Sequence, residues 1–262
     1  MRLNLYLARC GVASRRRAEK EYILKGKVKV NGEVVLNPAY HVSEDDIVEI
    51  NGRRVEPIGE SVWIAFYKPR AVLTTTRNQR IGSILDKRKN VMDYFKNFQT
   101  RVFPVGRLDY NTEGLLLFTN DGDMAQKLLK PHFGIEKEYW VWTDLKKKYR
   151  GKGLVSKVLE RLKCGMRLKD DRGEYLFKPC RVELVKDGDN WVFKLVITLG
   201  RNRVIRRAFA ALGVKIKKLL RVRIGNIELG KMLPGEWRYL TEKEVEQLKK
   251  LINKAITTPP LN

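Results

Sequence analysis

Short apolar segments separated by glycines run through the first sixty residues, a pattern typical of a small domain with brief elements. Apolar residues clustered in residues 3–8 predict a short helix that ends at Gly11. Ser14 is a typical N-cap residue and predicts a second helix that runs to about Leu24. The chain is therefore expected to begin with two short helices.

Beyond Gly26 the hydrophobic pattern changes to the two-residue alternation of strands. Lysine and valine alternate over residues 27–30, and the Asn31-Gly32 pair is typical of a type I′ hairpin turn. A further strand is predicted over residues 46–50. We expect these segments to form a hairpin with one added strand.

The rest of the chain mixes strands and helices without a repeated βαβ period, which favours a largely antiparallel or mixed sheet. Thr241 with Glu244 forms a capping box that begins a helix over residues 241–252, and residues 255–262 are expected to fray. One amphipathic run closed by a glycine predicts a helix over residues 206–214. Apolar or alternating runs predict strands over residues 63–69, 114–120 and 191–200 and a strand pair over 217–229.

Together these elements predict an α+β protein with three parts. We expect a small helix-plus-hairpin domain at residues 1–60, a larger domain with a largely antiparallel mixed sheet at 61–250, and a tail at 251–262.

The charge of the chain narrows the class of partner. Lys and Arg number 54 against 30 Asp and Glu, a formal net charge of +24, which predicts a polyanionic partner such as nucleic acid. The chain shows no apolar leader, no lipidation signal and no apolar run of transmembrane length, so we expect no membrane association. Three cysteines without a C-x-x-C pair favour a reduced, cytoplasmic protein without a zinc site.

Arg15 and Arg16 begin the second predicted helix, where the helix N-terminus adds partial positive charge suited to phosphate. A solvated basic face is the alternative interpretation. The segments G-V-A-S-R-R, V-N-G and the final D-x-V strand resemble the S4-like RNA-binding domain shared by a ribosomal protein and many RNA-modifying enzymes. The resemblance implies binding to structured RNA and no chemistry in this domain.

The segment from Asp109 to Gly114 is open to several interpretations when it is taken alone. It matches the first half of a calcium loop, D-x-N-x-E-G, but Asn120 stands where such a loop needs a glutamate. Residues 115–118 are also apolar, which disfavours calcium. A simple turn role for Asp109 is the other alternative, since aspartate readily bonds its own backbone.

The longer segment GRLDYNTEGLLLFTNDG resembles the catalytic motif of the RsuA/RluB family, the pseudouridine synthases that modify bacterial ribosomal RNA. The resemblance implies that Asp109 is the catalytic carboxylate and that Arg107 enters the space left by the target nucleotide. KEYWV resembles the family's K-x-Y-x-V strand, which implies that Tyr139 packs against the uracil.

LGRNRVIRRAF resembles a third motif of the family, E-G-R-N-R-Q-V-R-R-M, which implies that Arg206 forms an ion pair with the catalytic Asp. This chain departs from the motif at Leu199, Val204 and Ala208, although the arginine spacing is kept. Residues 199–223 hold nine Lys or Arg and no acid, which predicts a phosphate-binding face whatever the chemistry. Its predicted RNA-binding residues are Arg201, Arg203 and Arg207.

The resemblance implies isomerisation of a uridine in 23S or 16S ribosomal RNA to pseudouridine, with the target base flipped out of its stack. No nucleotide-binding motif occurs and no metal ligands cluster in the sequence, so no cofactor or metal is expected. A monomer is the default expectation. The alternatives from other classes are a non-catalytic ribosome-assembly factor and a nucleosidase or nuclease, which also uses a carboxylate near RNA.

Overall fold

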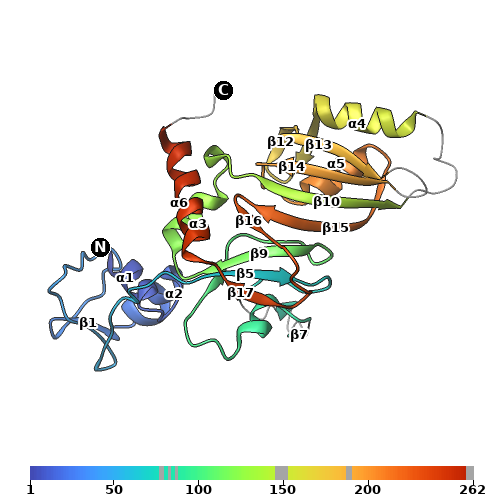
Figure 1. Cartoon of the computed structure of the whole chain (residues 1–262). Coiled ribbons are helices and arrows are strands. Elements are labelled where there is room, and N and C mark those ends of the chain that lie inside the picture. Colours follow the sequence, from blue (N-terminus) through green and yellow to red (C-terminus); the bar gives the residue numbers. More distant parts are fainter. Residues whose placement is uncertain (77–79, 82–83, 86–87, 145–152, 187–190, 258–262) are drawn as a thin grey trace. The chain divides into compact units, whose positions relative to one another are not determined.

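The computed structural model describes residues 1–76, 80–81, 84–85, 88–144, 153–186 and 191–257 (Figure 1). The chain divides into two compact units: residues 1–62 with 97–103 and 119–121, and residues 63–96 with 104–118 and 122–262. The α+β fold class is confirmed. The boundaries predicted at residues 60 and 250 stay predictions.

The first unit begins with the two predicted helices, α1 (Leu3–Arg9) and α2 (Arg15–Ala18). The Oγ of Ser14 accepts a hydrogen bond from the backbone N–H of Arg17 at 3.4 Å, which confirms the predicted N-cap. The second helix then widens into a π-helical turn, η1 (Glu19–Ile23), a change that the hydrophobic pattern did not predict.

A small sheet completes the first unit, with strand order β2-β1-β3-β4. Positive φ angles of 51° at Asn31 and 85° at Gly32 confirm the type I′ turn between β1 and β2. The sheet and helices enclose one hydrophobic core, in which Leu3, Leu7 and Ile23 are fully buried. The strand bounds are β1 (Val28–Val30), β2 (Glu33–Val34), β3 (Val48–Ile50) and β4 (Arg53–Arg54).

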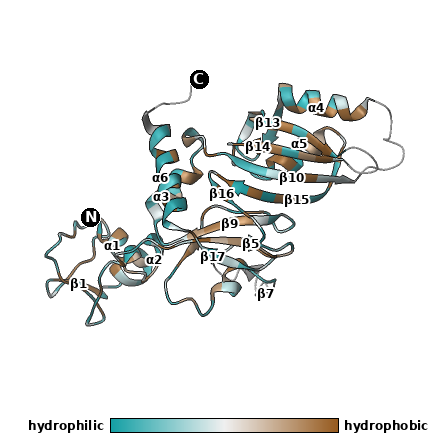
Figure 2. Cartoon of the chain, viewed as in Figure 1, coloured by the Kyte–Doolittle hydropathy of each residue, from teal (hydrophilic) through white to brown (hydrophobic). Residues whose placement is uncertain are grey.

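The second unit is built on a mixed sheet with strand order β13-β14-β10-β15-β9-β5-β17. β15 pairs with β9 in parallel, whereas β10/β14, β10/β15, β13/β14 and β17/β5 are antiparallel, as predicted. Figure 2 shows hydrophobic residues concentrated along β5 and β9, which are buried along almost their whole length. The bounds are β5 (Trp63–Lys68), β8 (Phe103–Pro104), β9 (Glu113–Thr119), β10 (Lys137–Asp144), β13 (Arg181–Lys186), β14 (Val192–Ile197), β15 (Lys215–Ile224), β16 (Ile227–Glu228) and β17 (Trp237–Tyr239).

Two predicted helices of this unit are present with shifted ends. Gly213, with a φ of +71°, closes helix α5 (Val204–Ala211). The backbone N–H of Thr241 donates to the Glu244 carboxylate at 2.9 Å, which confirms the capping box. Helix α6 (Glu242–Thr257) continues past its predicted end, so fraying from residue 255 is wrong as far as 257, and residues 258–262 lie outside the described chain.

Several other elements were not predicted from the pattern. Strand β11 (Met166–Asp170) buries every second residue, but the last of these is an aspartate, which hides the apolar period. β11 pairs with β12 (Gly173–Phe177) in a hairpin. The remaining elements are β6 (Arg80–Ile81), β7 (Ile84–Leu85), η2 (Val91–Phe95), α3 (Gly122–Leu129), η3 (Pro131–Phe133) and α4 (Leu154–Cys164).

Candidate active site

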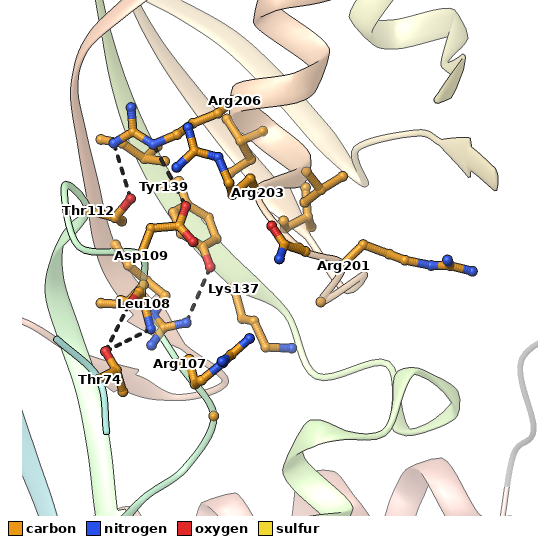
Figure 3. A pocket seen from close by; sticks show the side chains of 18 of the residues that line it. Thr74, Arg107, Leu108, Asp109, Thr112, Lys137, Tyr139, Arg201, Arg203 and Arg206 are labelled. Atoms are coloured by element: carbon orange, nitrogen blue, oxygen red, sulfur yellow. Dashed lines mark hydrogen bonds and ion pairs between the residues drawn. The ribbon is translucent and has the colours of Figure 1, made fainter. Parts of the chain in front are cut away.

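One pocket of about 560 Å³ lies in the second unit, within the size range of about 300–1,000 Å³ that small-molecule sites have. Residues from the loop between β8 and β9, from β10, from β15 and from the segment that precedes α5 line it. Figure 3 shows the side chains of Asp109, Tyr139 and Arg206 close together, with Arg201 extending away from them. The three residues predicted to be catalytic are therefore brought into one cavity.

The loop that carries Asp109 is held by hydrogen bonds to its backbone. The Thr74 hydroxyl donates to the Leu108 carbonyl at 2.8 Å and accepts from the Leu108 N–H at 3.3 Å. From β5, Lys68 Nζ donates to the Thr112 carbonyl at 2.8 Å. These contacts fix the backbone on both sides of Asp109, while its side chain stays 30% exposed to the pocket.

Arg206 completes the support of this loop from α5. Its Nη2 donates to the Asn111 carbonyl at 2.8 Å and to Thr112 Oγ1 at 3.2 Å. Its Nε lies 3.8 Å from Asp109 Oδ2, an ion pair that is too long for a hydrogen bond. Burial lowers the pKa of Arg206, and the charge of Asp109 opposes that shift. The guanidinium thus adds positive charge beside the carboxylate and orders its backbone.

Two lysines, one fully buried and the other partly exposed, add positive charge to the same region. Lys68 is fully buried, and burial lowers its pKa from 10.5 to about 8. Lys137, which lines the pocket, donates to the carbonyls of Ile135 at 3.0 Å and Thr198 at 3.3 Å. Burial also lowers the pKa of Lys137 to about 8. A pocket with this charge balance favours an anionic ligand.

Tyr139 lies on β10 and is only 8% exposed. Its hydroxyl oxygen accepts a hydrogen bond from Arg221 Nη1 at 3.3 Å. Both side chains line the pocket. The predicted position of Tyr139 beside the base is therefore compatible with its place in the cavity.

The predicted RNA-binding arginines fall into three groups. Arg107 and Arg203 line the pocket, and Arg15 and Arg16 are exposed in the first unit. Arg201 also lines the pocket, but its Nη1 forms an ion pair with Asp170 at 3.0 Å.

Arg207 is not among the residues that line the pocket. Its Nη1 donates to the Lys169 carbonyl at 2.6 Å. Arg201 and Arg207 thus both contact the β11–β12 hairpin, whose turn residues Asp171 and Arg172 line the pocket.

Sequence reasoning missed three cations of this site, Lys68, Lys137 and Arg221. The only signals available are a lysine at the end of a fully apolar strand, the lysine of the K-x-Y segment, and an arginine between apolar residues of a strand. Lys68 and Arg221 are unusual because a charge at a buried strand position needs polar partners.

The structure also bears on the metal alternative. β9 begins at Glu113, so residues 109–120 do not form a twelve-residue calcium loop. Within the described ranges, no three His, Cys, Asp or Glu side chains group as metal ligands would. No helix among the described residues has the length and apolar character to cross a membrane.

Comparisons with known proteins agree with this geometry. Residues 62–211 match the RNA pseudouridylate synthase family, and residues 1–48 match the S4 domain. Over 254 residues the chain is 41% identical to an uncharacterized RNA pseudouridine synthase of Aquifex aeolicus, covering 96% of this chain and 95% of that protein. It is 39% identical to the ribosomal large subunit pseudouridine synthase B of Bacillus subtilis, with 95% and 96% covered.

A crystal structure of a pseudouridylate synthase aligns with a TM-score of 0.62 and 26% identity over 95% of this chain and 99% of that one. The chain therefore belongs to the RNA pseudouridylate synthase family, and it is an isomerase that carries an S4 domain.

Proposed function

We propose that this enzyme isomerises a specific uridine of ribosomal RNA to pseudouridine and that Asp109 is its essential carboxylate. The observation that carries the proposal is the position of Asp109 in a basic pocket, 3.8 Å from Arg206 and on a loop held from several sides. The name of the Bacillus subtilis relative supports ribosomal RNA, and its large-subunit RNA in particular, as the substrate. The reaction then takes place in the cytoplasm, with the enzyme acting as a monomer.

The chemistry needs few groups. The bond between uracil N1 and the sugar C1′ breaks, the uracil rotates, and its C5 forms the new bond to C1′. Asp109 either adds covalently to the sugar or removes a proton from it to give an unsaturated intermediate. Both routes need the ionised carboxylate, and the guanidinium of Arg206 favours that form by its charge.

The remaining side chains extract and hold the base. Unstacking a nucleotide costs a few kcal/mol, and we propose that Arg107 offsets part of that cost by filling the vacated space. Tyr139 stacks against the flipped uracil and accepts the proton from C5. Arg203 at the pocket and Arg15 and Arg16 in the S4 domain bind phosphates. A Tyr139→Phe enzyme with full activity would remove the proton-acceptor role and leave the rest of the proposal in place.

The direct test is release of tritium from ribosomal RNA labelled at uracil C5. Wild-type protein is expected to release tritium, and Asp109→Asn is expected to release none, because the amide keeps the shape but lacks the charge. A protein that releases none from any ribosomal RNA fragment is instead a non-catalytic assembly factor. Free uracil or strand cleavage among the products would indicate a nucleosidase or nuclease.

The target uridine is tested separately. Mapping pseudouridines in both ribosomal RNAs of a strain that lacks the gene should reveal one site, or a few, that lose the modification. Restoring the gene with Asp109→Asn should leave those sites unmodified. Unchanged maps in both RNAs would contradict a ribosomal substrate.

A further inference from the structure

Arg221 is a buried cation of the pocket to which the sequence motifs assign no role. It lies on β15 directly opposite Tyr139 on β10, and residues paired in this way project from the same face of a sheet. Both side chains line the pocket, and Arg221 is only 4% exposed. The two residues therefore form a pair beside the space for the flipped base.

The guanidinium is only partly satisfied by its neighbours. Its Nε donates to the Leu115 carbonyl at 2.7 Å and its Nη1 donates to the Tyr139 hydroxyl at 3.3 Å. Its Cζ lies 5.9 Å from the centre of the Tyr139 ring. The buried Nη2 has no hydrogen-bond partner within the described part of the chain.

A purely structural role explains this arrangement poorly. A buried charge is costly even when it is fully paired, and an apolar residue of similar size at such a position is often at least as stabilising. An unpaired donor adds to that cost. Burial is the main cause of the low pKa of Lys68 and of Lys137, and the charge of Arg221 lowers both further, although Asp109 and Glu113 oppose the shift at Lys68. Arg221 is therefore kept in the pocket as a third cation, although its charge makes it more costly to hold Lys68 and Lys137 in their protonated forms.

We propose that Arg221 is a positioning residue of the isomerisation, which holds the phenol oxygen of Tyr139 and stabilises negative charge on it while Tyr139 removes the proton from uracil C5. This inference rests on the proposed function. A guanidinium N–H is a strong donor to a charged oxygen, and the buried setting strengthens the interaction.

The proposed step moves one proton from uracil C5 to N1 through Tyr139 and water. After C5 has joined C1′, the C5–H bond breaks and its proton passes to the Tyr139 oxygen, which has released its own proton to water. The C5–H electron pair becomes the C5–C6 double bond, and the C6–N1 π pair moves to N1. N1 then takes a proton from the hydronium ion, and Tyr139 ends as the neutral phenol from which it started.

The experiment compares four enzymes on RNA that carries hydrogen or deuterium at uracil C5: wild type, Arg221→Gln, Tyr139→Phe and the double variant. Arg223→Gln is the matched control, because Arg223 lies on the same strand and bonds to Glu136 and Glu138 away from the pocket. Each variant is first checked for cooperative thermal unfolding. If Arg221→Gln does not fold, Arg221→Lys replaces it in the same comparison.

For Arg221→Gln we expect kcat to fall about 10²-fold, as for loss of a donor that stabilises charge in a transition state. The C5 isotope effect on kcat should increase, because proton removal becomes slower, and Arg221→Lys should recover part of the rate. The double variant should be no slower than Tyr139→Phe, within about twofold. Arg223→Gln should lower thermal stability and leave the isotope effect as in the wild type.

Other outcomes overturn the inference. Additive losses in the double variant, or an unchanged isotope effect in Arg221→Gln, would mean that Arg221 does not act through Tyr139. A wild-type enzyme that forms no pseudouridine would instead remove the proposed function itself. The two failures are therefore distinguishable in one set of measurements.

Discussion

The two units of the chain place arginine in opposite environments. In the first unit Arg15 and Arg16 are exposed at the start of α2. In the second, Arg206 and Arg221 are largely buried, and each donates to a backbone carbonyl. Exposed arginines bind phosphates through charge and release of counterions, whereas buried ones fix geometry. The comparison predicts effects on RNA affinity from the first group and effects on the chemical step from the second.

Among the arginines of the two groups, the largest expected effect is that of Arg206→Gln. Loss of this guanidinium removes the donors to Asn111 and Thr112 and the charge beside Asp109. We expect kcat to fall about 10²–10³-fold with little change in KM. Single-turnover kinetics at saturating RNA measure the chemical step directly.

Arg206→Lys is the control for this prediction, because it keeps the charge but loses the fork that reaches two acceptors. It should have an intermediate rate. If either variant instead raises KM and leaves kcat unchanged, the comparison fails, because Arg206 would then behave like an exposed arginine that binds phosphate.

The second prediction concerns Arg201, which was predicted to bind RNA but forms an ion pair with Asp170. The Asp170 side chain is 1% exposed, and the Arg201 guanidinium also lies 4.7 Å from the Tyr175 ring. Arg201→Gln leaves that carboxylate buried without its cation and should cost about 2 kcal/mol of unfolding free energy, less than a fully buried pair because Arg201 is partly exposed. Chemical denaturation measures the loss.

Adding Asp170→Asn to Arg201→Gln should restore part of that stability, because the uncompensated charge is removed. If the double variant is instead less stable by the sum of both single losses, the pair does not hold the hairpin. Arg201 would then belong with the exposed group.

The third prediction concerns the exposed arginines of the first unit. Replacing Arg15 and Arg16 together by Gln should weaken RNA binding and lower the slope of log affinity against log salt by about 1 to 2. The change should fall on KM rather than on kcat. Arg17→Gln is the matched control, since Arg17 already forms an ion pair with Glu21 and should change the slope less. Equal slopes in all three proteins would contradict phosphate binding by α2.

Local signals in the sequence were sufficient wherever a residue acts on its near neighbours. The Asn31-Gly32 turn and the Thr241 capping box both depend on contacts within a few residues, and both are present. The three residues that the motifs identified, Asp109, Tyr139 and Arg206, also line one pocket.

The hydrogen bonds that hold the site in place could not be predicted in the same way. Arg221 donates to a carbonyl 106 residues away, and Lys68 donates to one 44 residues away. Any residue type offers such a carbonyl, so these partners leave no mark on the sequence. Only the pairing of β15 with β9 and the path of the Asp109 loop bring them together.

The last prediction tests whether the buried lysine Lys68 behaves like the buried arginines. Lys68 has a folded pKa of about 8, below its ordinary value of 10.5, so between these values the unfolded chain holds more protons than the folded one. The free energy of unfolding should therefore rise with pH in that window, by up to roughly 1 kcal/mol per pH unit. Below about pH 8 Lys68 is protonated in both states, so its cost to stability should no longer change with pH.

Lys68→Met isolates this term, because Lys137 titrates in both proteins and cancels in the difference. Urea denaturation from pH 7 to 10 should show wild type gaining stability relative to Lys68→Met only above about pH 8. Over the same range the wild-type kcat should fall, since the neutral amine no longer carries the charge that holds the Thr112 carbonyl. A stability difference that stays flat with pH would mean that Lys68 is not held charged at a cost, and that buried cations here do not share one behaviour.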